Sequence, residues 1–119
     1  MQNDVSDQNL SLLMLWEDIC CMSFELGDLM PKRVRFSLVA RLHQGCLEVM
    51  QCLNRARYAK GQKRLIQLRQ ADMELAGLKL VLRLSFKLKY VPAKKFEELA
   101  LLYHRAGSML GGWIKSCQS

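Results

Sequence analysis

Residues 68–91, LRQADMELAGLKLVLRLSFKLKYV, carry two apolar stripes on one predicted helix. At 100° per residue, the first stripe is assigned to the core and consists of Leu68, Ala71, Leu75, Leu78, Leu82 and Phe86. The second stripe lies on roughly the opposite flank and consists of Met73, Gly77, Leu80, Leu84 and Leu88. A surface helix of a monomer needs only one such stripe. The second stripe therefore predicts self-association, with an unusually deep core as the alternative.

A basic sector separates the two stripes. It contains Arg69, Lys79, Arg83, Lys87 and Tyr90, with Asp72 as its acidic member. Lys79, Arg83 and Lys87 are four residues apart and form a basic ladder that rises about 6 Å per step. Like charges at this spacing repel one another, and a phosphate backbone would offset the repulsion. The ladder predicts nucleic-acid binding; a solvated face of a basic protein is the alternative.

The flanking sequence predicts three more helices with the same 3.6-residue period. We expect helices over about 9–27, 34–58 and 62–89, and a fourth that follows Pro92. The stripe of the first consists of Leu12, Leu15, Ile19, Met22, Leu26 and Leu29, and that of the second of Leu38, Leu42, Val49, Leu53 and Ala56. The stripe of the fourth consists of Phe96, Leu99, Tyr103, Ala106, Leu110 and Trp113. The prediction is an all-α, antiparallel up-down-up-down four-helix bundle over 9–117, after a flexible tail over 1–8.

The stretch MLGGWIKS at 109–116 places two glycines inside the fourth predicted helix. Each glycine costs a helix interior about 0.5–1 kcal/mol relative to alanine. Trp113 continues the apolar stripe past them, so the helix has not stopped at Gly111. We interpret Gly111, Gly112 and Trp113 as a site of close approach to another helix, within the oligomer interface. This interpretation predicts that Gly111→Ala destabilises the protein by crowding.

Charge divides the chain into two parts. Residues 1–28 contain six acidic and no basic residues, whereas 29–119 contain all 18 basic residues and five acidic ones. Basic residues also crowd the connection between the second and third helices, at Arg55, Arg57, Lys60, Lys63 and Arg64, and the start of the second helix, at Lys32, Arg33, Arg35 and Arg41. A basic body of this kind indicates an anionic partner.

The sequence contains no pattern typical of an enzyme, a metal site or a cofactor site. It has no Gly-rich phosphate loop and no nucleophile elbow. The five cysteines include no C-x-x-C pair, so we expect reduced thiols. His43 and His104 have no partner at metal-ligand spacing and are expected on helix surfaces. Without a signal peptide or a membrane-length apolar run, the chain is expected in the cytoplasm and away from membranes.

Four segments together resemble the accessory variability determinant (Avd) proteins of diversity-generating retroelements. They are PKRVRFSLVARL at 31–42, RARYAK at 55–60, the central stretch at 68–91, and GSMLGGWIKS at 107–116. The resemblance covers about residues 10–116. It implies a four-helix bundle that assembles as a basic homopentameric barrel, in a bacterial or phage-encoded system. It also implies binding to RNA or an RNA–DNA hybrid and to the retroelement reverse transcriptase.

Avd proteins have no catalytic residues. They are required when the reverse transcriptase copies template-repeat RNA into mutagenised complementary DNA. Carried over by pattern, the nucleic-acid residues are those of the basic ladder; the other basic residues are assigned by charge alone. Related four-helix proteins encoded within intervening sequences of ribosomal RNA are one alternative, and a helical assembly protein without a nucleic-acid role is another.

Overall fold

The computed structural model describes residues 2–118, and the side chains of residues 9–118. Four long helices make up this part of the chain: α1 (Gln2–Leu29), α2 (Ala40–Tyr58), α3 (Gly61–Lys87) and α4 (Ala93–Gln118). No strand occurs among the described residues. The prediction of an all-helical chain with four helices is thereby confirmed.

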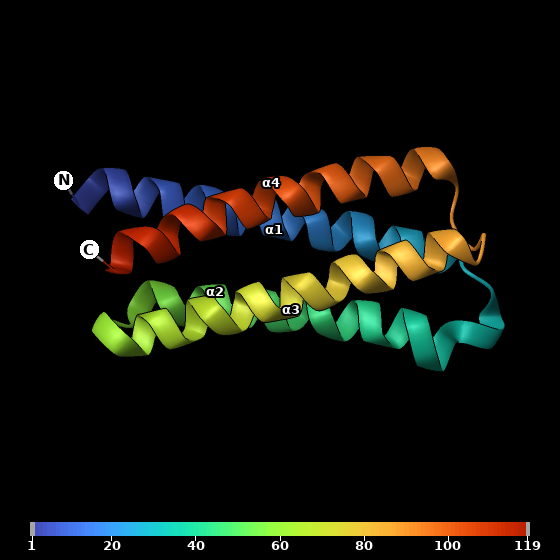
Figure 1. The fold of residues 1–119 in the computed structure, drawn as a ribbon, viewed down its shortest axis with the longest axis horizontal. Helices are drawn as coiled ribbons and strands as arrows, with labels where there is room; N and C mark the ends of the chain where they lie inside the picture. Colours follow the sequence, from blue (N-terminus) through green and yellow to red (C-terminus); the bar gives the residue numbers. More distant parts are fainter. Residues whose placement is uncertain (1, 119) are drawn as a thin grey trace.

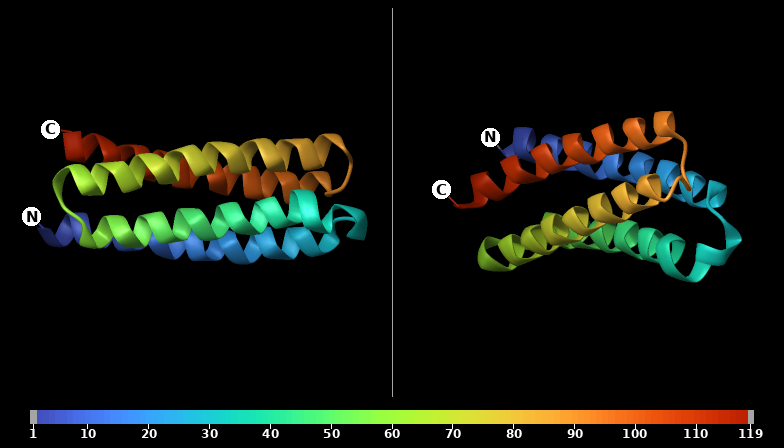
Figure 2. Two further views of the ribbon diagram at one scale, coloured as in Figure 1. Left: turned by 90° about the horizontal axis from the view of Figure 1, so that it is seen from below. Right: turned by 45° about the vertical axis from the view of Figure 1, so that its right-hand side comes forward.

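The four helices lie alongside one another over most of their length (Figures 1 and 2). α1 leads away from the end where both termini lie, α2 returns to it, and α3 and α4 repeat this course. In this arrangement α1 lies between α2 and α4, and α3 lies between the same two helices on the opposite side. The outward faces of α1 and α3 therefore point away from each other.

The start of α2 differs from the prediction. A 3-10 turn (Lys32–Val34) and a π-helix (Arg35–Val39) precede the α-helix, which begins at Ala40 and not near residue 34. Pro31 precedes the 3-10 turn with an extended backbone, at φ −59° and ψ 144°. The chain after Pro31 is thus helical throughout but changes its pitch twice before it joins the bundle.

The ends of α1 and α3 also differ from the predictions. α1 begins at Gln2 and passes through Gly27 to Leu29; the flexibility of residues 1–8 stays a prediction. A Cβ on Gly27 would lie 3.2 Å from a methyl carbon of Val39, so this glycine accommodates the neighbouring helix and does not end α1. α3 ends at Lys87, two residues early, because the chain reverses at Lys89 with a φ of 63°. The Tyr90 N–H then donates to the Ser85 carbonyl at 3.0 Å, a helix ending that usually has glycine where Lys89 stands.

The predicted core of α1 is confirmed at Leu12, Ile19 and Leu26, which are buried, whereas the alternate positions shift by one residue, from Leu15, Met22 and Leu29 to Trp16, Ser23 and Met30. Trp16 is completely buried, and its Nε1–H donates to the Cys46 carbonyl at 2.8 Å. Its ring stacks on Tyr103, with the ring centres 5.9 Å apart. Buried Ser23 continues this face, where its hydroxyl oxygen lies 3.0 Å from the Tyr103 hydroxyl. The predicted stripe followed Leu29 instead, which is exposed.

The predicted core of α3 and α4 is confirmed in most positions. Leu68, Ala71, Leu75, Leu78 and Leu82 of α3 are buried, as are Leu99, Tyr103, Ala106, Leu110 and Trp113 of α4. The predicted burial of Phe86 is wrong, since more than a third of its surface is exposed. Its ring stacks on Phe96 of α4 at the edge of the core, with the ring centres 4.3 Å apart.

Candidate nucleic-acid interface

The second stripe of α3 lies on the outer surface of the bundle. Its four large side chains remain exposed in the single chain: Met73 by 71%, Leu80 by 64%, Leu84 by 47% and Leu88 by 46%. Ile66, which is also exposed, extends the stripe toward the start of the helix. The alternative of an unusually deep core is therefore wrong, because these side chains face away from it.

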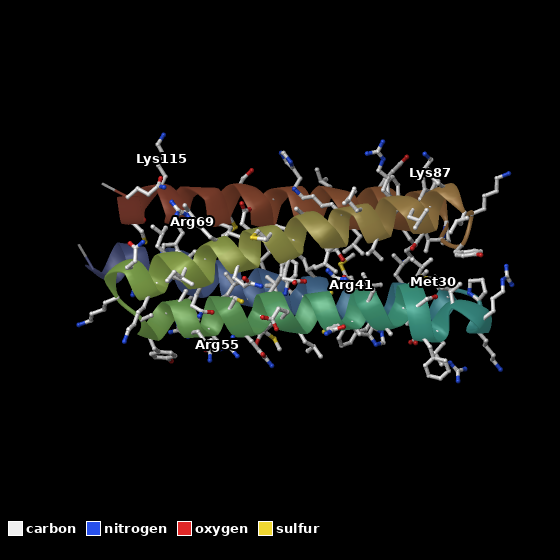
Figure 3. All side chains as sticks on the ribbon, turned by 60° about the horizontal axis from the view of Figure 1, so that its bottom comes forward. Met30, Arg41, Arg55, Arg69, Lys87 and Lys115 are labelled. Carbon is white, nitrogen blue, oxygen red and sulfur yellow. The ribbon has the colours of Figure 1, made fainter. Side chains whose placement is uncertain are left out.

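The basic ladder occupies the flank of α3 that adjoins α4. Lys79, Arg83 and Lys87 are all exposed, as is Arg69. The Lys79 Nζ leans toward α4, since a Cβ on Gly107 would lie 3.5 Å from it. Figure 3 shows Arg69 and Lys87 toward opposite ends of α3. The structure thus keeps the ladder together but separates Arg69 from it along the helix.

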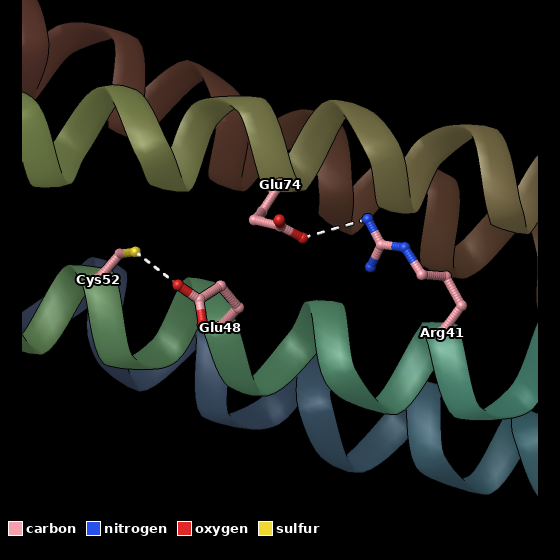
Figure 4. Close-up of polar contacts among 4 residues, drawn as sticks. All are labelled: Arg41, Glu48, Cys52 and Glu74. Atoms are coloured by element: carbon pink, nitrogen blue, oxygen red, sulfur yellow. Dashed lines mark hydrogen bonds and ion pairs between the residues drawn. The ribbon is translucent and has the colours of Figure 1, made fainter.

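Arg41 has a structural partner. Its guanidinium group crosses from α2 to α3 and forms an ion pair with Glu74, with 3.2 Å between Nη2 and Oε1 (Figure 4). The side chain passes over Gly45 and Gly77, where added Cβ atoms would lie 2.8 Å and 3.0 Å from its terminal nitrogens. Arg41 thus bridges two helices, and its assignment to nucleic-acid binding stays a prediction.

Arg64 also serves the fold. Its Nε–H donates to the Ala56 carbonyl at 2.9 Å and its Nη2 to the Arg57 carbonyl at 3.3 Å, which satisfies the exposed end of α2. The same guanidinium lies 5.9 Å from the centre of the Trp113 ring. Of its cluster, Arg55, Lys60 and Lys63 are exposed, and half-buried Arg57 lies over the Tyr58 ring at 5.3 Å.

A second basic surface forms where two connections meet. The α1–α2 and α3–α4 connections lie at the same end of the bundle, opposite the termini (Figure 1). Arg33 from one connection lies over the Tyr90 ring from the other, 5.3 Å from its centre. We call this surface the basic end; its exposed members are Lys32, Arg33, Arg35, Lys87, Lys89 and Lys94. None of these six forms an ion pair with any residue whose side chain the structure describes.

Sequence reasoning missed two members of the basic end. Lys89 and Lys94 were not assigned to any site, and Tyr90 was placed only in the basic sector of the third predicted helix, because more than fifty residues separate these three from Lys32 and Arg33. The basic end could have been predicted from the short connections between the helices, because in an up-and-down bundle the first and third connections lie at the same end. Lys95, nearby on α4, instead lines a pocket with Glu25 and Asp28 of α1, so its charge is partly compensated.

An exposed aromatic ring accompanies the basic end. Phe36, on the π-helix between α1 and α2, is 89% exposed. The other described phenylalanine rings have aromatic partners: Phe24 lies against His43, and Phe86 stacks on Phe96. Phe36 therefore presents an open apolar ring in the segment that also carries Arg33 and Arg35.

Gly111 and Gly112 differ from Trp113 in their surroundings within the protomer, and a contact of the two glycines with another copy stays a prediction. Within the chain, a Cβ on Gly111 or Gly112 would meet no atom within 4 Å. Trp113 is only 6% exposed, so it belongs to the bundle core and has little area left for a second chain. The predicted close approach thus does not occur inside the protomer, although both glycines do lie within α4.

We now expect Gly111→Ala to stabilise the protomer, contrary to the expectation from sequence. The position is exposed, it has no positive φ, and alanine favours the helix by about 0.5–1 kcal/mol. Denaturant unfolding of the dissociated protein measures this gain. A loss of stability in the protomer would contradict the open space at Gly111, and a loss of assembly alone would place the glycine against another copy.

The cysteine and histidine side chains are the remaining candidates for reactive or metal-binding groups. The cysteines with described side chains are free, as predicted. Burial, and then the charge of Glu48, raises the pKa of the Cys52 thiol to about 11, so this thiol stays protonated at neutral pH and donates to Glu48 (Figure 4). His43 is half-buried and not a surface residue, whereas His104 is exposed as expected. Among the described residues, no three His, Cys, Asp or Glu side chains gather as metal ligands.

Comparison with known proteins adds one family. A family model described as bAvd-like matches residues 5–117. No curated protein matches the chain. No helix in the described part of the chain combines the length and apolar character needed to cross a bilayer.

Proposed function

We propose that this chain, which belongs to the bAvd-like family, is a non-enzymatic accessory protein of a retroelement reverse transcriptase. In this role it binds RNA, or an RNA–DNA hybrid, in the cytoplasm and supports mutagenic copying of template RNA into complementary DNA. The functional unit is a homopentameric barrel of antiparallel up-down-up-down bundles. Family membership and the resemblance to Avd proteins together supply this role, because the chain itself has no pattern typical of catalysis.

The observation that carries the proposal is the uncompensated positive charge on two joined surfaces. The basic ladder and the basic end share Lys87, so positive side chains continue from the flank of α3 onto the end of the bundle. None of these side chains forms an ion pair with a described acidic residue. A strand of phosphates is the ligand that such a surface fits, since each basic group would replace a condensed counterion.

The acidic residues limit where RNA would lie. The exposed face of α1 carries Glu17, Asp18, Glu25 and Asp28. α1 and α3 lie on opposite sides of the bundle (Figure 2). Electrostatic repulsion would therefore keep a polyanion away from α1 and favour the α3 side of the bundle, including the part of the basic end that adjoins α3.

Assembly rests on the second stripe in this proposal. Its exposed leucines would each contribute about 1.5–3 kcal/mol if a second copy covered them. A ring of such copies would also repeat the basic ladder, so that weak phosphate contacts add up to useful avidity. Assembly and RNA binding would thus use adjacent but different faces of α3.

Removal of the basic ladder tests the proposed RNA role. We expect the triple change Lys79→Ala, Arg83→Ala and Lys87→Ala to weaken binding of a single-stranded RNA about 100-fold at 0.1 M salt. Three lost phosphate contacts would also reduce the slope of log affinity against log salt by about 2. Fluorescence anisotropy across a salt series measures both quantities, and light scattering checks that the variant still assembles.

The matched control removes exposed positive charge from α4, away from both basic surfaces. Arg105→Ala with Lys115→Ala should change the salt slope much less. An unchanged affinity and slope in an assembled triple variant would contradict the role of the ladder. The cluster around Arg55 and Lys63 would then be the better candidate for the RNA contact.

A further inference from the structure

The basic end holds an aromatic ring whose exposure nothing in the fold requires. Phe36 is 89% exposed, although neighbouring Val39 on the same π-helix is buried in the core. The π-helix is a rare geometry that is common at functional sites. Its last residue, Val39, anchors the segment, while Phe36, which directly follows Arg35 in the sequence, extends into solvent.

The two aromatic rings of the basic end are not equivalent. Tyr90 is half-buried, and the Arg33 guanidinium lies 5.3 Å from the centre of its ring. Phe36 has no aromatic or cationic group over its ring among the described residues. Phe36 is therefore the ring with a free face, and six basic side chains without ion pairs lie at the same end of the bundle.

We propose that Phe36 stacks on an unpaired base and makes the basic end a site for single-stranded RNA. This inference rests on the proposed RNA-binding function and adds the class of strand that the site prefers. Phosphates would lie among Lys32, Arg35 and Lys89, while one base turns toward the phenyl ring. Because every base has a flat face, the contact tolerates any sequence.

Single strands fit this site better than duplexes. Bases within a duplex are stacked on one another and present only their edges, so they offer no face to Phe36. The positive charges alone attract both kinds of strand. Any preference for the single strand must therefore come from the ring.

The test compares two RNA probes of equal phosphate number, a single-stranded oligouridine and a duplex. Phe36→Ala is expected to weaken binding of the single strand by about 5- to 150-fold, the range found when one stacked base loses its aromatic partner. Duplex affinity and the salt slope should stay unchanged, because no positive charge is removed. Phe36→Trp should restore single-strand binding, whereas Phe36→Leu should not.

The matched control is Leu101→Ala, which removes a side chain that is 69% exposed on α4. It should affect neither probe. Circular dichroism and light scattering verify that each variant folds and assembles like the original protein, as expected for an exposed position.

Three results would overturn the inference. The first is an unchanged affinity of Phe36→Ala for the single-stranded probe, and the second is an equal loss of affinity for both probes. The third is a Phe36→Ala protein that keeps its RNA affinity but no longer binds the reverse transcriptase, which would make Phe36 a protein contact. In each of these cases the ladder variant still tests RNA binding. The outcome for Phe36 therefore does not decide whether the proposed function is correct. Absence of RNA binding by the unmodified protein would refute the proposed function itself.

Discussion

Leu84→Glu is expected to convert the assembly into folded single chains of 13.7 kDa. Leu84 lies in the middle of the second stripe and is 47% exposed in the protomer, so a glutamate there meets water when the chain is alone. In an interface between copies, the same carboxylate would be buried without a partner, which costs several kcal/mol. Because a closed ring repeats the contact at every junction, the loss applies to the whole assembly.

Light scattering at micromolar concentration measures this dissociation, and circular dichroism monitors the helices. Leu101→Glu is the matched control, since Leu101 is equally apolar and exposed but lies on α4 outside the second stripe. We expect the control to keep the assembled mass. If the Leu84→Glu protein remains assembled, the second stripe is not part of the interface. If it unfolds, the exposed position of Leu84 is contradicted.

The stripes of α3 and α4 were predictable because both helices follow a regular apolar period over about five turns. Their large side chains are buried or exposed as expected, apart from the exposed Phe86 and the half-buried Phe96 that stacks on it. α1 was harder, since Ser23 interrupts its true core face. The partner that makes this serine acceptable, the hydroxyl of Tyr103, lies eighty residues away in the sequence.

The part of the site that lies on a single helix was predictable from the sequence, whereas the part formed by segments that are distant in the sequence was not. The basic ladder lies on α3 alone, so its spacing was sufficient to place it on one face. The basic end needs two distant connections, and its most exposed ring, Phe36, belongs to a π-helix that no periodicity indicates.

The structural arginines show a related limit. Arg41 and Arg64 carry the same charge in the sequence as the free lysines. The ion pair of Arg41 with Glu74 and the hydrogen bond of Arg64 to the end of α2 form only after the helices have packed. Similarly, Gly111 was interpreted from its neighbours in sequence, whereas the open space around it is apparent only in the folded protomer.

We propose that this protein supports RNA copying by a retroelement reverse transcriptase without catalysis of its own. It would do so by holding the template RNA on its basic surfaces close to the enzyme. The largest functional effect should therefore follow from leaving the protein out, because the polymerase active site alone would lack this positioning. The ladder variant should reduce the yield of complementary DNA, and Leu84→Glu should reduce it further by removing avidity.

The most direct measurement is the yield of complementary DNA from template-repeat RNA by the purified cognate reverse transcriptase, with and without this protein. We expect full-length product only when the assembled protein is present, and product near background without it. An equal yield in both reactions would refute the proposed function.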